Sequence, residues 1–158
     1  IDFLLNRNDE EVSIRLSFNG KECASAKEEE DYFIRQMNET QELLCNIPHT
    51  RKNSLKYLIK YYKTTVTELA ANIDRDRKSL ERLLSGETKD PSKETIIRIC
   101  FALHLPPAVS KEFLSIMGVS LNYAEDQTHF WIDHALNYKY AENYDVVIEF
   151  LQSKKVKI

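Results

Sequence analysis

The sequence predicts a mainly α-helical protein with one small β-hairpin near its start, and three observations support this fold class. Only three Gly and four Pro interrupt the 158 residues, whereas Leu, Ile, Glu and Lys, which favour helices, are abundant. From residue 27 onward, apolar residues recur at three- and four-residue intervals. Ser, Thr and Asp residues stand where these stretches begin, as helix caps do. The length fits one compact domain, or one domain with appendages.

The β-hairpin is predicted over residues 12–26. Apolar and polar side chains alternate strictly over residues 12–18, which is the two-residue period of a half-buried strand. Asn19-Gly20 tolerates the positive φ of a tight turn, so residues 21–26 are expected to return as the second strand. A lone hairpin is marginally stable in water, so it must pack on another element.

A helix is predicted next, over residues 27–47, and Pro48 closes it. The acidic run from Glu28 to Asp31 suits the positive end of the helix dipole, and we interpret it as a helix start rather than an interaction tail. Several apolar residues could share one stripe of this helix. They are Phe33, Ile34, Met37, Leu44 and Ile47.

Helical signals are stronger in the middle of the chain. Ser54 is the expected cap of a helix over SLKYLIKYYK. Thr65 is the expected cap of the next helix, with Glu68 as its partner in a capping box. A third helix is expected between Asp76, as its cap, and Gly86, as its left-handed end.

Further helices are predicted from Ser92 to the C-terminus. Ser92 caps a helix that Pro106-Pro107 stops, and a new helix begins at the second of these prolines. Two more are expected over about 126–138 and 144–153, and this region is rich in aromatic residues. At helical spacing, such residues usually belong to a core or to a surface for a partner chain.

Charge is distributed unevenly, although the net charge is only −3. Residues 1–49 carry five Lys or Arg against eleven Asp or Glu, residues 50–118 carry thirteen against eight, and residues 119–158 carry four against six. A basic segment between acidic flanks is expected where one segment meets a polyanion. We therefore predict three parts: an acidic hairpin and helix, a basic helical domain, and an aromatic-rich C-terminal helical segment.

Composition and motifs argue against several other classes of protein. No apolar run is long enough to span a membrane and no signal segment opens the chain, so a cytoplasmic protein is expected. Cys23, Cys45 and Cys100 form no CxxC pair, which indicates reduced thiols rather than zinc or disulfides. The four histidines form no HExxH motif, and no nucleophile–base spacing or Gly-rich phosphate loop stands out. No catalytic residue, metal or cofactor is therefore predicted, and we expect no enzyme.

The stretch ELAANIDRDRKSLERLLSG (68–86), followed by DPSKETIIRICFAL, resembles the lambda-repressor-like, XRE-type helix-turn-helix family. Its apolar residues stand where the family packs its second helix, locks two helices together and anchors the third. These are Leu69, Ala70, Ile73, Leu80 and Leu83. Gly86 and Pro91 follow the third of these helices, where the family also has residues that end it. The resemblance covers about 54–117 and implies that the basic part, 50–118, is a helix-turn-helix bundle that binds double-stranded DNA.

This resemblance implies that the helix at about 77–85 reads the major groove, where the first residues of a recognition helix reach base edges. Arg77 and Lys78 would donate to guanine, and Ser79 would touch phosphate. Lysines and Arg82 would neutralise phosphates, and two threonines would donate hydrogen bonds to them. The predicted DNA-binding residues are Lys60, Lys63, Thr65, Thr67, Arg77, Lys78, Ser79 and Arg82.

The sequence departs from the family's pattern at two places. Val66 stands where the family often has a Gln that braces the backbone and the recognition side chains. The turn carries Asp74-Arg75, where Gly and an apolar residue are usual. Either this turn is tightened differently, or Ile73 alone seals it.

Carboxylates also lie beside the predicted DNA face. Asp74, Asp76 and Glu81 would repel phosphates if they were unpaired. Glu81 either pairs with Arg77 one turn away or accepts a hydrogen bond from cytosine N4, and we favour the pair.

The predicted function is a DNA-binding transcriptional regulator that acts as a homodimer. The aromatic C-terminal segment is a candidate for dimerisation or for docking on the basic domain, and the acidic N-terminal part could cover and regulate that domain. The alternative is a helix-turn-helix used as a protein–protein interaction or regulatory module within a larger protein. The acidic flanks, the carboxylates near the recognition helix and a first residue that is Ile1 rather than Met favour this alternative.

Overall fold

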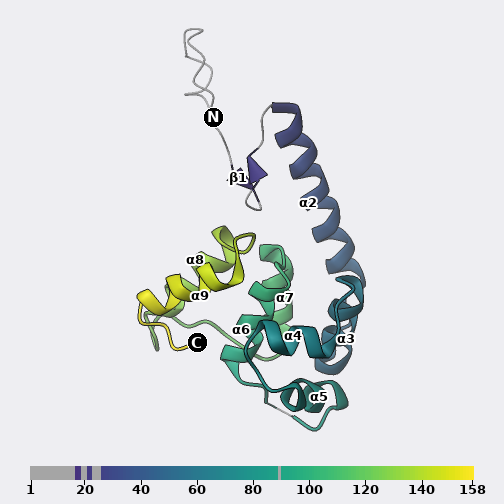
Figure 1. The fold of residues 1–158 in the computed structure, drawn as a ribbon, viewed down its shortest axis with the longest axis vertical. Helices are drawn as coiled ribbons and strands as arrows, with labels where there is room; N and C mark the ends of the chain where they lie inside the picture. Colours follow the sequence, from purple (N-terminus) through teal and green to yellow (C-terminus); the bar gives the residue numbers. More distant parts are fainter. Residues whose placement is uncertain (1–16, 19–20, 23–25, 89) are drawn as a thin grey trace.

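The computed structural model describes residues 17–18, 21–22, 26–88 and 90–158, and this part of the chain is mainly helical, as predicted. Figure 1 shows how the helices are arranged around a compact body, from which one long helix projects. The helices are α2 (Ala26–Asn46), α3 (Arg51–Tyr61), α4 (Val66–Asn72), α5 (Arg77–Ser85), α6 (Lys93–Ala102), α7 (Pro107–Ile116), α8 (His129–Tyr138) and α9 (Tyr144–Ser153).

The predicted β-hairpin is not confirmed as a packed element. The structure describes two short strands of it, β1 (Ser17–Phe18) and β2 (Lys21–Glu22), which pair antiparallel. The rest of the hairpin lies outside the described residues. The predicted return strand is wrong at Ala26, because this residue begins α2. Ala followed by Lys and Glu is a strong helix-forming sequence, which explains the difference.

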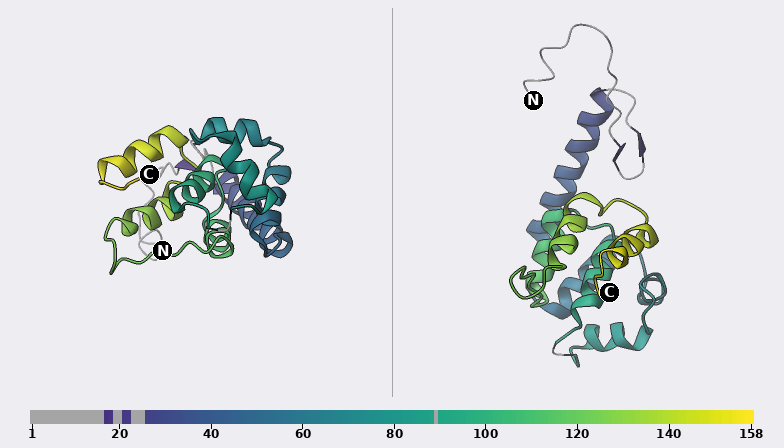
Figure 2. Two further views of the ribbon diagram at one scale, coloured as in Figure 1. Left: turned by 90° about the horizontal axis from the view of Figure 1, so that it is seen from below. Right: turned by 90° about the vertical axis from the view of Figure 1, so that its left-hand side faces the viewer.

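The hydrophobic core is built around α6. Its residues from Ile96 to Phe101 are all buried, and α4, α7 and α9 pack against it. In the left view of Figure 2, the yellow C-terminal helix α9 (Tyr144–Ser153) and the blue-purple α2 lie on opposite sides of the body. The same cluster includes Leu43 from α2 and Leu151 from α9. The hydrophobic core therefore extends across all three predicted parts, whose boundaries stay a prediction.

Helix boundaries follow the predicted caps at most positions. One difference is α3, which begins one turn earlier than expected because Thr50 is its cap and accepts a hydrogen bond from the Asn53 amide at 3.3 Å. Ser54 is buried inside this helix, where its hydroxyl donates to the Arg51 carbonyl at 3.0 Å. A second difference is that α6 ends at Ala102, with Leu103 as its C-cap, before the predicted stop at Pro106, because His104 adopts a left-handed φ of 51°. As predicted, α7 begins at Pro107.

The long helix α2 is attached to the body by its C-terminal half. It packs against α7, and the Tyr62 hydroxyl after α3 donates to the Glu39 carboxylate at 2.9 Å. Burial and this carboxylate both raise the pKa of Tyr62, which keeps the hydroxyl a donor. In Figure 1 the N-terminal half of α2 extends beyond the compact body.

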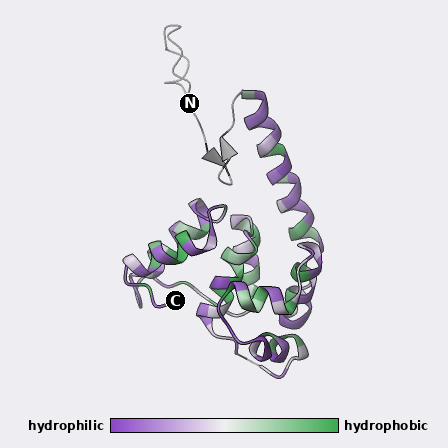
Figure 3. Ribbon diagram, viewed as in Figure 1, coloured by the Kyte–Doolittle hydropathy of each residue, from purple (hydrophilic) through white to green (hydrophobic). Residues whose placement is uncertain are grey.

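The residues predicted to form one stripe of α2 do not share one environment. Ile47 is buried, whereas Ile34 and Met37 are 50% and 71% exposed. The buried face of α2 is instead marked by Tyr32 and Leu43. Hydrophobic and hydrophilic turns consequently alternate along the projecting part of this helix (Figure 3).

We expect that Leu80→Ala will lower the free energy of unfolding by about 2–5 kcal/mol, because it leaves a cavity where a fully buried side chain locks α5 to the core. Chemical denaturation followed by circular dichroism measures this change. Lys78→Ala, an exposed position in the same helix, is the control and should change stability by less than about 0.5 kcal/mol. Equal effects of the two substitutions would contradict the packing described for Leu80.

Candidate nucleic-acid interface

The helices α4 and α5 form a helix-turn-helix with a capped start on each helix. The Thr65 hydroxyl oxygen accepts from the Glu68 amide at 3.2 Å, and the Asp76 carboxylate accepts from the Lys78 amide at 3.3 Å. These contacts satisfy amides that lack a partner at the first turn of a helix. Gly86 ends α5 with a left-handed φ of 84°. The roles of Thr65, Asp76 and Gly86 at these helix ends were all predicted from the sequence. Local chemistry therefore determines where these helices begin and where α5 ends.

The turn between the helices closes without glycine. Asp74 takes the left-handed conformation, with a φ of 53°, and its amide donates to the Ala71 carbonyl at 3.2 Å. The next amide, of Arg75, donates to the Ala70 carbonyl at 3.0 Å. Asp tolerates this conformation better than most residues, because its short polar side chain can bond locally. The turn is therefore tightened by its own backbone, and buried Ile73 seals it from the inside.

Two arginines fasten this turn to α6. Arg98, which is only 8% exposed, donates through Nη1 to the Ile73 carbonyl at 2.9 Å. Arg75 donates through Nε to the Thr95 hydroxyl at 3.3 Å. A hydrogen bond from a charged donor stabilises more than a neutral one, so these contacts hold the turn against α6.

Arg98 was not among the predicted functional residues, and the structure shows what it connects. Its Nη1 atom also lies 3.4 Å from the hydroxyl oxygen of Tyr144, the first residue of α9. Burial raises the pKa of this tyrosine and the Arg98 charge opposes the rise, so the hydroxyl stays protonated. A charged residue within the apolar run IIRICF was the available signal. Such a residue must find buried acceptors, and the turn carbonyl is one.

The candidate DNA-reading side chains of α5 lie at the protein surface. Leu80 and Leu83 are buried, whereas Arg77, Lys78 and Ser79 are exposed at the start of the helix. Arg82, one turn further on, is exposed as well. The structure therefore brings these four residues together at one end of the body, where Figure 1 shows α5.

An ion pair joins two side chains on this exposed surface. Arg77 Nε lies 2.7 Å from the Glu81 carboxylate, which confirms the favoured pairing of Glu81. Both side chains are about half exposed, at 61% and 46%, so water screens the pair and its energy is small. Arg77 can therefore exchange this carboxylate for another acceptor at little cost.

The remaining candidates form a second group, around the junction of α3 and α4. Lys60 is exposed in the last turn of α3, and Lys63 holds the junction with a left-handed φ of 52°. Thr65 uses its oxygen as a helix cap, but its hydroxyl hydrogen is available to donate, and Thr67 is exposed. Val66, at the family's usual Gln position, is half-buried against the core. It therefore packs instead of bracing recognition side chains.

Three findings in the described part of the chain concern metal binding, a thiol and membrane spans. No group of three or more His, Cys, Asp or Glu in it could hold a metal ion. Cys100 is fully buried, which raises the pKa of its thiol to about 12 and makes it a poor nucleophile. None of the described helices is both long enough and apolar enough to cross a membrane.

These elements form a helix-turn-helix whose second helix is α5. Residues 54–108 match the family model of the Cro/C1-type HTH DNA-binding domain. This match runs from the first turns of α3 into the start of α7 and confirms the resemblance to the XRE-type family. No curated protein and no solved structure gave a significant match to the chain.

We expect that Asp74→Gly will raise the free energy of unfolding by about 0.5–1 kcal/mol, because glycine adopts the left-handed φ at this position without a Cβ penalty. Thermal or chemical denaturation measures the change. Asp74→Val is the opposite variant and should destabilise, since a β-branched residue is strained there. The same sign for both variants would contradict the described turn.

Proposed function

We propose that this chain is a DNA-binding transcriptional regulator, with α5 as the helix that enters the major groove. One observation carries the proposal: a Cro/C1-type helix-turn-helix domain presents Arg77, Lys78 and Ser79 on the exposed first turn of its third helix. The first turn of a recognition helix reaches base edges in complexes of this class. The basic charge of residues 50–118 adds a sequence-independent attraction to the phosphate backbone.

In this proposal the candidate residues divide into two roles. Arg77 and Lys78 contact base edges, where an Arg or Lys donates to guanine O6 and N7. Ser79 and Arg82 contact phosphates beside the groove. Four residues at the junction of α3 and α4 position the domain on the DNA by contacting its phosphates. They are Lys60, Lys63, Thr65 and Thr67.

Two-fold symmetry is part of the proposal. Helix-turn-helix dimers bind half-sites about one helical turn apart, and one recognition helix contacts few base pairs by itself. Exposed apolar side chains on α2 and on the C-terminal helices offer surfaces for a second copy. Among them are Ile34, Met37, Phe130 and Tyr138.

The second candidate function is a helix-turn-helix used as a protein-interaction module. Its support is the ion pair of Arg77 with Glu81 and the exposed carboxylates Asp74 and Asp76 nearby, which lower the positive potential of this surface. DNA binding distinguishes the two candidates, because attraction to phosphates weakens steeply with salt and a neutral protein interface does not.

We expect the chain to bind a fluorescent, mixed-sequence DNA duplex with an affinity that falls steeply as salt increases. Arg77→Ala/Lys78→Ala should weaken binding at low salt by about 1–3 kcal/mol for each of the two side chains that donates to a base. If one of the two side chains neutralises a phosphate instead, its removal should reduce the slope of log affinity against log salt concentration by about one. Fluorescence anisotropy across a salt series measures both quantities.

The matched control is Lys27→Ala/Arg35→Ala, which removes one Lys and one Arg from exposed positions on α2, far from α5 in Figure 1. It should leave the affinity within about twofold of the parent, since charges beyond about 10 Å are screened. Undetectable binding of the parent chain at low salt would reject the proposed function and favour the protein-interaction module.

Glu81→Gln should increase DNA affinity, by about 0.5–1 kcal/mol at low salt. The substitution removes a negative charge beside the groove and releases Arg77 from its ion pair at 2.7 Å. Anisotropy titrations against the same duplex test this, with Glu149→Gln at an exposed position of α9 as the control. A loss of affinity would instead indicate that Glu81 itself accepts a hydrogen bond from a base.

A further inference from the structure

A row of lysines runs along the outer side of α3, and only its end belongs to the candidate nucleic-acid interface. The lysine row consists of Lys52, Lys56 and Lys60 on α3 and Lys63 just after it, and all four side chains are exposed. At about 100° per residue, the three positions within α3 fall in a sector of about 80°. This sector lies on the side away from buried Leu55 and Leu58. Lys52 and Lys56 have no role in the proposed function.

The lysine row has no acidic partner in the described part of the chain. No Asp or Glu occurs from residue 50 to residue 67. Of the ion pairs between described residues, none includes a lysine of this row. The neighbouring Arg51 reaches Asp90 at 3.5 Å, but this carboxylate is 96% exposed, so water screens the pair. The four ammonium groups are therefore available to an anion from outside the described structure.

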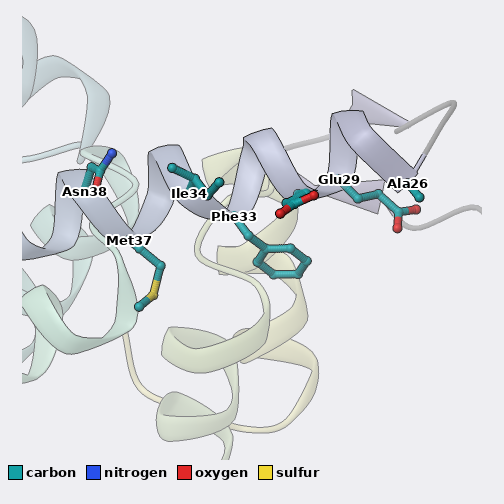
Figure 4. Close-up of a pocket in the computed structure, with 7 residues that line it drawn as sticks. Ala26, Glu29, Phe33, Ile34, Met37 and Asn38 are labelled. Atoms are coloured by element: carbon teal, nitrogen blue, oxygen red, sulfur yellow. The ribbon is translucent and has the colours of Figure 1, made fainter.

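This arrangement opposes the stability of α3. Lysines four residues apart lie one helical turn apart on the surface, so successive members of the row repel one another. The first turn of a helix also carries the positive end of its dipole, which disfavours cations such as Arg51 and Lys52. Helix α2 has the favourable pattern, because Glu29 stands in its first turn, as Figure 4 shows. The charges of α3 therefore cost stability where those of α2 add to it.

A surface that weakens its own helix without a compensating contact is typical of a functional site. Solubility does not require such a surface, since interspersed charges of both signs serve that purpose as well. A row of basic residues along one helix is instead the electrostatic footprint of a polyanion.

Two observations indicate that this polyanion is the DNA of the proposed function. The row ends at the junction of α3 and α4, where Lys60 and Lys63 are candidates for phosphate contacts, and α3 packs directly against α5. At 1.5 Å per residue, Lys52 lies about 12 Å along α3 from Lys60. One DNA strand carries a phosphate for about every 3.4 Å of helix axis, so this length spans about three or four phosphates. The backbone of bound DNA therefore fits the row in charge and in extent.

We propose that Lys52 and Lys56 bind DNA phosphates, so that α3 extends the DNA-contacting surface of the domain beyond the segment that α5 reads. These contacts add affinity without base recognition, because an ammonium group bonded to a phosphate oxygen holds DNA of any sequence. Bound phosphates also neutralise the repulsion within the row. This inference deepens the proposed function, on which it rests, by adding flanking backbone to the DNA that the protein contacts.

The test is the salt dependence of DNA binding by the full chain, measured by fluorescence anisotropy with the mixed-sequence duplex. Each phosphate that a lysine neutralises contributes about 0.9 to the slope of log affinity against log salt concentration. Lys52→Ala/Lys56→Ala should therefore reduce this slope by about two and weaken binding at low salt by about tenfold or more. The matched control is Lys27→Ala/Lys157→Ala, which removes two exposed lysines outside the row and should leave the slope unchanged.

Thermal denaturation without DNA provides a second readout. Lys52→Ala/Lys56→Ala removes the repulsion and the cation in the first turn, and Ala is the strongest helix former. The variant should therefore melt at or above the melting temperature of the parent chain. A lower melting temperature would mean that the row serves the fold and would overturn the proposal.

Comparison with Arg77→Ala/Lys78→Ala separates this proposal from the proposed function. An unchanged slope for Lys52→Ala/Lys56→Ala, alongside weaker binding by the α5 variant, would overturn the proposal and leave α5 as the recognition helix. A reduced slope for the α3 variant, with unaffected binding by the α5 variant, would support the phosphate contacts and reject α5 as the recognition helix. Undetectable binding of the parent chain at low salt would reject both.

Discussion

The structure depends on the burial of α6. Six consecutive residues of this helix, from Ile96 to Phe101, are buried, so the helix needs neighbours on every side. Helices α4, α7 and α9 supply them, and the helix-turn-helix consequently shares its core with the C-terminal segment. Because Arg98 is the charged member of the buried run, its guanidinium finds its acceptors in the turn carbonyl of Ile73 and the hydroxyl of Tyr144. One buried helix thus fixes both the packing and the geometry of the turn.

This constraint separates the parts of the helix-turn-helix that hold it together from the parts that are available to a ligand. The buried side chains of Leu80 and Leu83 hold α5 against the core. Backbone hydrogen bonds of Asp74 and Arg75 close the turn. The outer surface of α5 has no role in this packing, and its Arg77–Glu81 pair is exposed and weak. Its charges can therefore rearrange with little effect on stability.

The helix α2 follows a different principle from the body. Its C-terminal half contributes Leu43 to the common core, whereas its projecting half has too few neighbours to bury its apolar residues. A helix with apolar residues on two sides has more hydrophobic surface than one body can cover.

Local patterns in the sequence determined the helices and much of the helix-turn-helix. The caps Thr65, Asp76 and Ser92 and the left-handed Gly86 act over three or four residues, so they were readable without a fold. The family resemblance likewise implied that Ile73 and Leu80 lock two helices together, and both side chains are buried. The cap of α3 was misplaced at Ser54, because Thr50 offers the same chemistry one turn earlier.

Contacts between distant segments were decided only by the tertiary structure. Arg98 lies 25 residues from the carbonyl it holds and 46 from the hydroxyl it meets, and no local pattern encodes such separations. Periodicity placed Ile34, Met37 and Ile47 on one stripe of α2, but the body covers the last of them and leaves the first two exposed. The sequence by itself determined which residues are apolar and how they are spaced. The packing of α7 against α2 decided which of them became core, because burial depends on neighbours that lie far away along the chain.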